Sequence, residues 1–182
     1  DLDDRAARLA TALAARGVEV GDRLVAQVAK SVDAVALYLA CIRSGVVFVP
    51  LNTAYTRREV TGFVDDADAR LLVDDAVLTA VGDEADRCDP APVVERRGDD
   101  PAAMLYTSGT TGRSKGAVLS CRNLVANAGA LIEAWRFSAD DVLVHVLPVF
   151  HVHGLFVALH CAFGVGAAVR FHERFDVEAV RR

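Results

Sequence analysis

The apolar residues of the first 73 positions form two kinds of pattern, helical stripes and short continuous runs. Residues typical of helix ends accompany the stripes: Gly17 follows the first, and Ser31 precedes the second. Thr56 and Glu59 have capping-box spacing at the start of the third. Helices are therefore expected at residues 2–16, 32–44 and 57–67, and buried strands at residues 24–28, 46–49 and 70–73.

The rest of the chain begins with a stretch of weak periodicity. Residues 74–101 are rich in Asp, Arg, Ala and Pro, and we interpret them as a variable surface stretch or the seam between two layers. Farther on, an apolar stripe from Leu124 to Trp135 predicts a helix, and residues 154–163 predict a deeply buried one because they are apolar on nearly all sides. The remaining expectations are strands at 102–106, 116–119, 142–147 and 167–171, a loop at 107–115, a turn at 148–153 and a helix beginning at 176.

Strands that alternate with helices predict an α/β fold, with mainly parallel sheets flanked by helices. With 182 residues, 53% of them hydrophobic, the chain is large enough for one domain with a core. We divide it into βαβ units at 1–73, the variable surface stretch at 74–101, and a part at 102–182 that carries the candidate chemistry. The chain lacks an initial Met and opens directly on a helical stripe, so we expect a trimmed piece of a longer protein.

Charge and cysteine spacing exclude several classes of protein. A net charge of −5 without a basic cluster argues against nucleic-acid binding. The longest apolar run, residues 154–169, is interrupted by His160 and glycines, so no transmembrane segment is expected. The widely spaced cysteines favour neither a disulfide scaffold nor a zinc site and fit a reducing cytoplasm; they are Cys41, Cys88, Cys121 and Cys161.

Residues 107–116, TSGTTGRSKG, are the most informative stretch of the sequence. Glycines allow close backbone approach, so that several N–H groups can converge on one anion, while hydroxyls and Lys115 add donors and a positive charge. Placed between two strands, such a loop can hold the β- and γ-phosphates of a nucleotide. The candidate phosphate-binding residues are Thr107, Ser108, Gly109, Thr110, Thr111, Gly112, Lys115 and Gly116.

Two other interpretations of this loop were weighed. A plain Gly/Ser/Thr turn in a hairpin does not account for five clustered hydroxyls beside Arg113 and Lys115. A Walker A loop requires GxxxxGK[ST], but Ser114 precedes the lysine here and Gly116 follows it. The sequence therefore disfavours a P-loop kinase or ATPase, which would release ADP.

The stretch from Tyr106 to Gly116 resembles the phosphate-loop signature of the adenylate-forming superfamily, which includes acyl-CoA synthetases, luciferases and peptide-synthetase adenylation domains. The family usually has Pro where this chain has Ser114, and Arg before Ser-Lys-Gly is similar to the malonyl-CoA synthetase branch. Residues 50–55, PLNTAY, also resemble that branch. Two positions depart from the pattern, Ala29 in place of an acid and Cys121 in place of a common His.

A second motif, residues 147–154 (LPVFHVHG), is similar to the superfamily's second core motif. The resemblance implies that His151, the candidate catalytic residue, lies near the acyl carbonyl and that Phe150 helps to form the wall of the acyl channel. We expect His153 to contact the substrate as well. Three interpretations stay open here: His151 as a core histidine, His153 as a core histidine, or a His-x-His metal pair with His145 as a third ligand. The third lacks a suitably spaced acidic or Cys partner, and His145 is more in keeping with a structural role on its strand.

The resemblance implies a fragment of the large amino-terminal domain of an acyl-CoA synthetase, without the carboxy-terminal domain. Such an enzyme joins a carboxylic acid, here malonate or methylmalonate, to coenzyme A through an acyl-adenylate made from ATP and Mg²⁺. The Mg²⁺ ligand, the ribose-binding acid and the adenylation lysine are expected beyond Arg182, so no metal ligand is predicted within this chain. The alternatives are another acid, whether fatty, acetyl or aryl, and a non-catalytic nucleotide-binding fragment.

Overall fold

The computed structural model describes residues 1–107 and 114–181. The chain divides into two compact units, Asp1–Cys121 and Arg122–Arg182. Each unit is described by itself.

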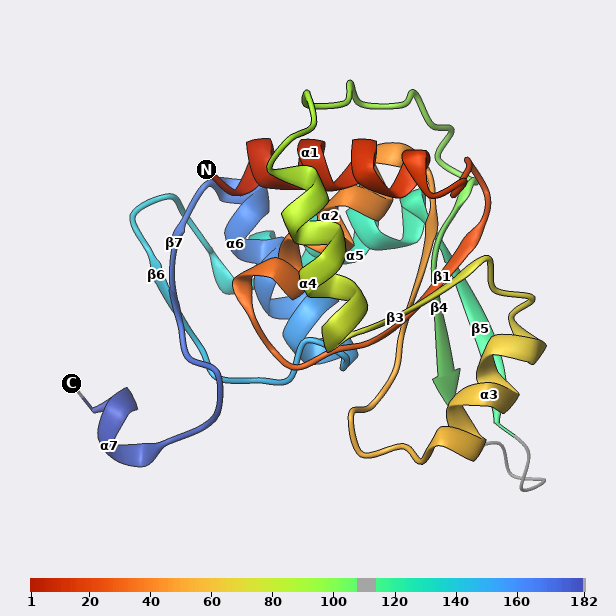
Figure 1. The fold of residues 1–182 in the computed structure, drawn as a ribbon. Helices are drawn as coiled ribbons and strands as arrows, with labels where there is room; N and C mark the ends of the chain where they lie inside the picture. Colours follow the sequence, from red (N-terminus) through yellow and green to blue (C-terminus); the bar gives the residue numbers. More distant parts are fainter. Residues whose placement is uncertain (108–113, 182) are drawn as a thin grey trace. The chain divides into compact units, whose positions relative to one another are not determined.

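The first unit contains a five-stranded sheet with the strand order β3-β1-β2-β4-β5 (Figure 1). Neighbouring strands are parallel from β3 through β4, and β5 joins the edge antiparallel to β4. Val25 lies at the centre, paired with Val49 on one side and Leu72 on the other. The predicted α/β fold with a mainly parallel sheet is confirmed. The strands are β1 (Arg23–Gln27), β2 (Val47–Pro50), β3 (Leu71–Asp74), β4 (Pro101–Thr107) and β5 (Lys115–Ser120).

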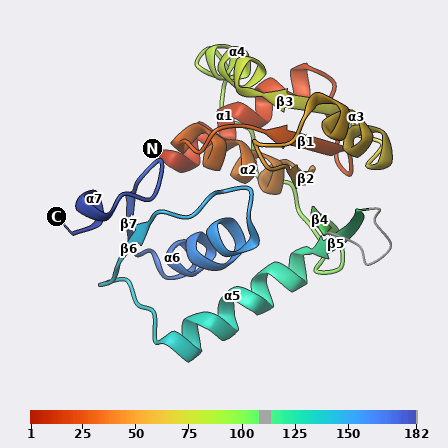
Figure 2. The same ribbon diagram turned by 90° about the horizontal axis from the view of Figure 1, so that it is seen from below.

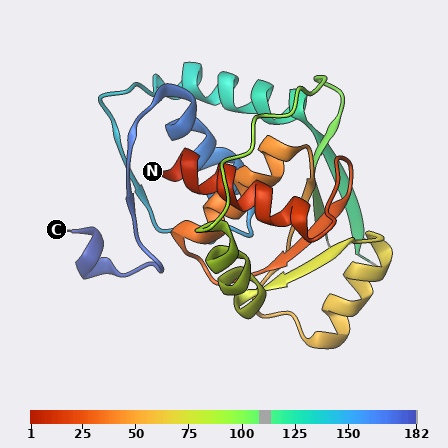
Figure 3. The same cartoon turned by 45° about the horizontal axis from the view of Figure 1, so that its top comes forward.

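Helices cover both faces of this sheet (Figure 3). α1 (Leu2–Ala15), α2 (Val32–Ser44) and α4 (Asp75–Ala85) pack together on one side, and α3 (Arg57–Asp66) lies on the other. Because both faces are covered, β1 and β2 are buried almost throughout. Val60 of α3 joins Val25 and Val49 in the core beneath that helix.

The predicted helix ends agree with the structure. The Ser31 side chain accepts a hydrogen bond from the Ala34 N–H at the start of α2, and Gly45 ends that helix in the left-handed region with φ of 74°. At α3, Thr56 accepts from the Glu59 N–H, and the Glu59 carboxylate accepts from the Thr56 N–H at 2.7 Å. The capping box is therefore complete.

Helix α4 was missed, because residues 74–101 were expected to be a variable surface stretch or a seam and no helix was predicted there. Asp74 caps α4 by accepting from the Val77 N–H. The buried residues of α4 have the i, i+3, i+4, i+7 spacing of an amphipathic helix; they are Leu78, Val81, Gly82 and Ala85. The stripe is short and two of its four residues are small. The helical pattern is therefore hard to recognise among the surrounding charged residues.

The family resemblance leads us to expect an acid at position 29, where this chain has Ala29. Asp75, the first residue of α4, places a carboxylate beside that position. The Ala29 N–H donates to the Asp75 carboxylate at 2.8 Å. The carboxylate that accepts from the turn after β1 thus belongs to the residue that follows β3.

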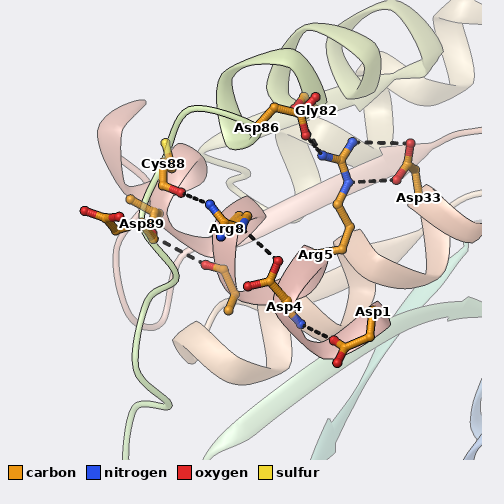
Figure 4. A network of polar contacts seen from close by, with 11 residues as sticks. Asp1, Asp4, Arg5, Arg8, Asp33, Gly82, Asp86, Cys88 and Asp89 are labelled. Atoms are coloured by element: carbon orange, nitrogen blue, oxygen red, sulfur yellow. Dashed lines mark hydrogen bonds and ion pairs between the residues drawn. The ribbon is translucent and has the colours of Figure 1, made fainter.

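Arg5 connects three helices through one side chain (Figure 4). Its guanidinium donates to Asp33 of α2 at 3.0 Å, to Asp86 at the end of α4 at 2.5 Å, and to the Gly82 carbonyl at 3.2 Å. The Arg5 side chain is only 24% exposed, whereas the side chains of Asp33 and Asp86 are 49% and 67% exposed. Solvent weakens each ion pair, but one cation holds both partners.

Replacing Arg5 with Met in the full-length protein should lower the free energy of unfolding by about 1–2 kcal/mol. Met preserves the packed stem but removes every donor, so the contacts that Arg5 itself makes with α2 and α4 are lost. Urea denaturation measures the change. The matched control is Arg58→Met on the exposed surface of α3, which should change it by less than about 0.5 kcal/mol. Equal effects of the two substitutions would contradict the role assigned to Arg5.

The second unit contains a two-stranded parallel sheet of β6 (Val142–His145) and β7 (Ala168–Phe171). The predicted helix at residues 154–163 begins instead as a π-helix, η1 (His153–Leu159), and continues as α6 (His160–Val165). It is less buried than expected, since Leu155 and Phe156 are buried but Phe163 is 36% exposed. α5 (Cys121–Trp135) runs beside this segment (Figure 2), and Asn127 donates to the Phe156 carbonyl at 3.4 Å. A short helix, α7 (Val177–Val180), follows.

No helix in the described part of the chain is long and apolar enough to cross a membrane.

Candidate functional site

The candidate phosphate loop is the connection of the β4–β5 hairpin. Thr107 and Lys115 face each other across the antiparallel pair, and Tyr106 pairs with Gly116 one step further from the loop. Thr107, Lys115 and Gly116 are all exposed. The other candidate phosphate ligands lie outside the described residues: Ser108, Gly109, Thr110, Thr111 and Gly112. The structure thus places the ends of the loop together, with one hydroxyl and one ammonium group available to an anion.

Gly116 lies under two side chains of β4 at the base of the hairpin, a packing feature that the sequence did not reveal. A Cβ atom at Gly116 would lie 2.8 Å from the Met104 sulfur and 3.4 Å from the Tyr106 ring. Its missing side chain leaves room for these two residues of β4 to extend across β5. The glycine therefore shapes the hairpin at the point where the chain leaves the loop.

Tyr106 ties the same point to helix α3. Its hydroxyl donates to the Asp66 carboxylate at 2.9 Å, and its ring lies on Phe63 with 4.5 Å between centroids. Phe63 in turn contacts Tyr55 at 5.1 Å. Sequence reasoning placed Phe63 on the apolar stripe of α3 but missed Asp66 as a partner of the loop-bearing strand. Helix α3, which connects β2 to β3, thereby holds the residue directly before the loop.

The histidine turn, residues 148–154, lies in the second unit. Phe150 is half-buried and its ring centroid is 5.1 Å from that of His151, which is exposed. His153 is exposed as well and is the first residue of η1. The His151 carbonyl accepts from the Leu155 N–H at 3.0 Å, which joins the turn to the π-helix. The structure therefore brings Phe150 and His151 together and leaves both histidines accessible.

His145 lies beneath this turn and is 1% exposed. Its Nε2 is 3.0 Å from the Gly154 carbonyl oxygen, and its ring stacks on Phe171 at 5.3 Å with an interplanar angle of 3°. Among the described residues, no group of three or more His, Cys, Asp or Glu side chains is placed to hold a metal ion. These contacts support the structural interpretation of His145 over a metal ligand.

His160, the first residue of α6, is kept neutral by burial. Burial lowers its pKa from 6.5 to about 4. The unfolded chain takes up a proton at a higher pH than the folded one, so acidification from pH 6.5 towards pH 4 favours unfolding. His160 is thus a packed residue of the helix, in contact with the Phe156 ring at 5.6 Å.

The comparison with known families identifies the chain. The AMP-binding enzyme family matches residues 1–182, the whole sequence, so the chain belongs to this family. Its fold agrees with that assignment, since solved amino-terminal domains of acyl-CoA synthetases superpose on it.

Four relatives show how the similarity is distributed. ATP-bound MatB from Rhodopseudomonas palustris superposes with a TM-score of 0.92 at 44% identity, over 99% of this chain and 41% of that one. O-succinylbenzoate coenzyme A synthetase from Bacillus subtilis, in complex with ATP and magnesium ion, gives 0.88 at 26% identity, over 100% and 52%. The oxalate–CoA ligase of Arabidopsis thaliana is 33% identical over 93% of this chain and 38% of its own length. The malonate–CoA ligase of the same plant is 32% identical over 84% and 29%.

The chain spans about two fifths or less of these curated ligases. Both curated relatives are named as CoA ligases, and the two related structures hold ATP, one of them together with a magnesium ion. Ligases for different acids are about equally similar to the chain, so similarity alone does not select the acid.

Proposed function

We propose that the full-length protein is an acid–CoA ligase that converts malonate or methylmalonate into its CoA thioester through an acyl-adenylate. One observation carries the proposal: a chain of the AMP-binding family presents Thr107 and Lys115 together at the base of the signature loop. In the first step a carboxylate oxygen attacks the α-phosphorus of ATP and pyrophosphate leaves. In the second, the thiol of coenzyme A attacks the acyl carbonyl and AMP leaves.

In the first step, this chain's residues bind and orient the phosphates. Lys115 supplies a positive charge, and the Thr107 hydroxyl donates a hydrogen bond at the opposite end of the loop. We assign the remaining contacts to Ser108, Thr110 and Thr111, with Gly109, Gly112 and Gly116 allowing the backbone to approach. Mg²⁺ bound with ATP neutralises phosphate charge. The resemblance to the adenylate-forming superfamily implies that the protein ligand of Mg²⁺ lies beyond Arg182, in the part of the parent outside this chain.

For the acyl group, we propose that Phe150 and His151 form one wall of the pocket. The half-buried ring gives an apolar surface beside the accessible imidazole. His151 then lies near the carbonyl where acid, adenylate and thiol meet.

The localisation remains a prediction: the four free thiols are in keeping with a reducing cytoplasm.

Relatives named for indoleacetate or 4-coumarate are about as similar to the chain as those named for oxalate or malonate, so the choice of acid rests on the site. A small dicarboxylate such as malonate carries a second carboxylate. That group stays charged during the reaction, and burying it without partners would cost several kcal/mol. A fatty-acid site has no such requirement. An exposed imidazole at His153, two residues from His151, offers a donor for the second carboxylate.

The experiment that tests the proposal measures the products of the full-length protein. With ATP, CoA and malonate, methylmalonate, oxalate, acetate, butyrate or an aryl acid, we expect AMP and pyrophosphate, and the highest kcat/KM with malonate or methylmalonate. Release of ADP would indicate a kinase. Preference for a monocarboxylate would favour the alternative acid, and nucleotide binding without any product would favour the non-catalytic alternative.

Replacing His153 with Val should lower kcat/KM for malonate by about tenfold relative to acetate or butyrate, because one hydrogen bond to a charged group is lost. The ratio of malonate to butyrate activity is the measurement. His160→Gln serves as the control, since it alters a packed histidine of the same segment. If malonate loses no ground against the monocarboxylates, His153 does not read the second carboxylate.

A further inference from the structure

Gly154 is fixed from two directions at the junction between the histidine turn and η1. A Cβ atom here would overlap the carbonyl oxygen of Pro148, so the backbone of the turn and that of the π-helix lie directly against each other. On its other side, the Gly154 carbonyl oxygen meets Nε2 of His145 at 3.0 Å. These contacts close the turn that carries His151 and His153.

The chemistry of the second contact defines the state of the His145 ring. A carbonyl oxygen can only accept, so Nε2 must carry the proton that it donates. The stack on Phe171 fixes the plane of the ring, and the pairing of β6 with β7 fixes the position of the His145 backbone. The contact is shielded from water, because His145 is 1% exposed and Gly154 is buried. A buried bond of this kind has one geometry and no solvent substitute.

We propose that His145 is a positioning residue for acid activation: its Nε2–H holds the Gly154 carbonyl and so sets the position of Phe150, His151 and His153. This inference rests on the proposed function, which places those three residues at the acyl group. His145 itself does not touch substrate in this scheme. Sequence reasoning left it as a structural residue of its strand, and the structure adds which backbone group it holds.

The test uses three substitutions in the full-length protein. His145→Phe keeps a ring against Phe171 but removes the donor, and His145→Gln keeps a donor of similar reach without the ring. His172→Gln changes a histidine just after β7 and serves as the control. We expect the Phe variant to lose about tenfold or more in kcat/KM for the acid while its KM for ATP stays within about twofold. The Gln variant should recover most of that loss, and the control should match the wild type.

A second measurement does not depend on turnover. Hydrogen exchange of the backbone amides in residues 148–156 should be faster in the Phe variant than in the wild type and near normal in the Gln variant. If the Phe variant does not fold, His145→Asn replaces it, since its amide is too short to reach the Gly154 carbonyl.

The outcomes separate the two proposals. Equal losses in the Phe and Gln variants, or equal effects on acid and ATP, would overturn the positioning role and leave His145 as a packing residue. Unchanged exchange in the donor-lacking variants would overturn it as well. A wild-type protein that makes no adenylate from any acid would refute the proposed function, while the exchange data would still decide whether His145 holds the turn.

Discussion

Replacing Gly154 with Ala is expected to lower kcat/KM for the acid by at least about 100-fold and to destabilise the full-length protein by about 3 kcal/mol. The added methyl group would overlap the Pro148 carbonyl oxygen, which belongs to the backbone and cannot rotate away. Either the turn or the start of η1 must move. Both carry residues assigned to the acyl pocket, so the chemistry suffers together with the stability.

The control is Gly129→Ala in the middle of α5, where an added Cβ would meet nothing within 4 Å. Alanine favours a helix over glycine by about 0.5–1 kcal/mol, so this substitution should leave activity unchanged and raise the unfolding midpoint slightly. Thermal unfolding and acid-dependent pyrophosphate release measure both variants. A Gly154→Ala protein with wild-type kinetics would show that the close approach to Pro148 has no role in the site.

The sequence was sufficient where local chemistry decides the structure. Ser31, Gly45 and the pair Thr56 and Glu59 define helix ends through contacts within a few residues, and all were predicted. The two strands that flank the glycine-rich loop were also predicted from their apolar runs, whereas their antiparallel pairing was not. The anion site assigned to Lys115 and the hydroxyls stays a prediction from residue identity alone.

Contacts between distant residues could not be predicted in the same way. Tyr106 and Asp66 are 40 positions apart, and their hydrogen bond depends on how α3 packs. The π-helical start of η1 was expected as ordinary helix, since nothing in the local pattern distinguishes the two. The need for glycine at position 154 comes from its close approach to the Pro148 carbonyl, which the sequence does not show. Tertiary packing, not local propensity, determines these features.

Each unit holds one of the two motifs through its own contacts. Tyr106 and Gly116 shape the phosphate hairpin within the first unit, and His145 and Gly154 shape the histidine turn within the second. Substitutions in the two motifs should therefore affect different kinetic parameters: the hairpin should govern ATP and the turn should govern the acid.

Replacing Lys115 with Ala in the full-length protein should slow ATP–pyrophosphate exchange by about 10- to 150-fold, because one charge-assisted contact with phosphate is worth about 1.5–3 kcal/mol. Lys115 is exposed at the start of β5, so its removal should hardly change the unfolding midpoint. The acid's KM should change little, in contrast to substitutions in the histidine turn.

Two further variants separate charge from position in the Lys115 experiment. Lys115→Arg keeps the charge in a different geometry and should lose less exchange activity than the Ala variant. Arg87→Ala removes an exposed cation elsewhere in the same unit and should leave exchange unchanged, which excludes a general effect of net charge. If Lys115→Ala exchanges pyrophosphate at the wild-type rate, or if its loss appears in the acid's KM instead, then Lys115 does not bind the phosphates of ATP.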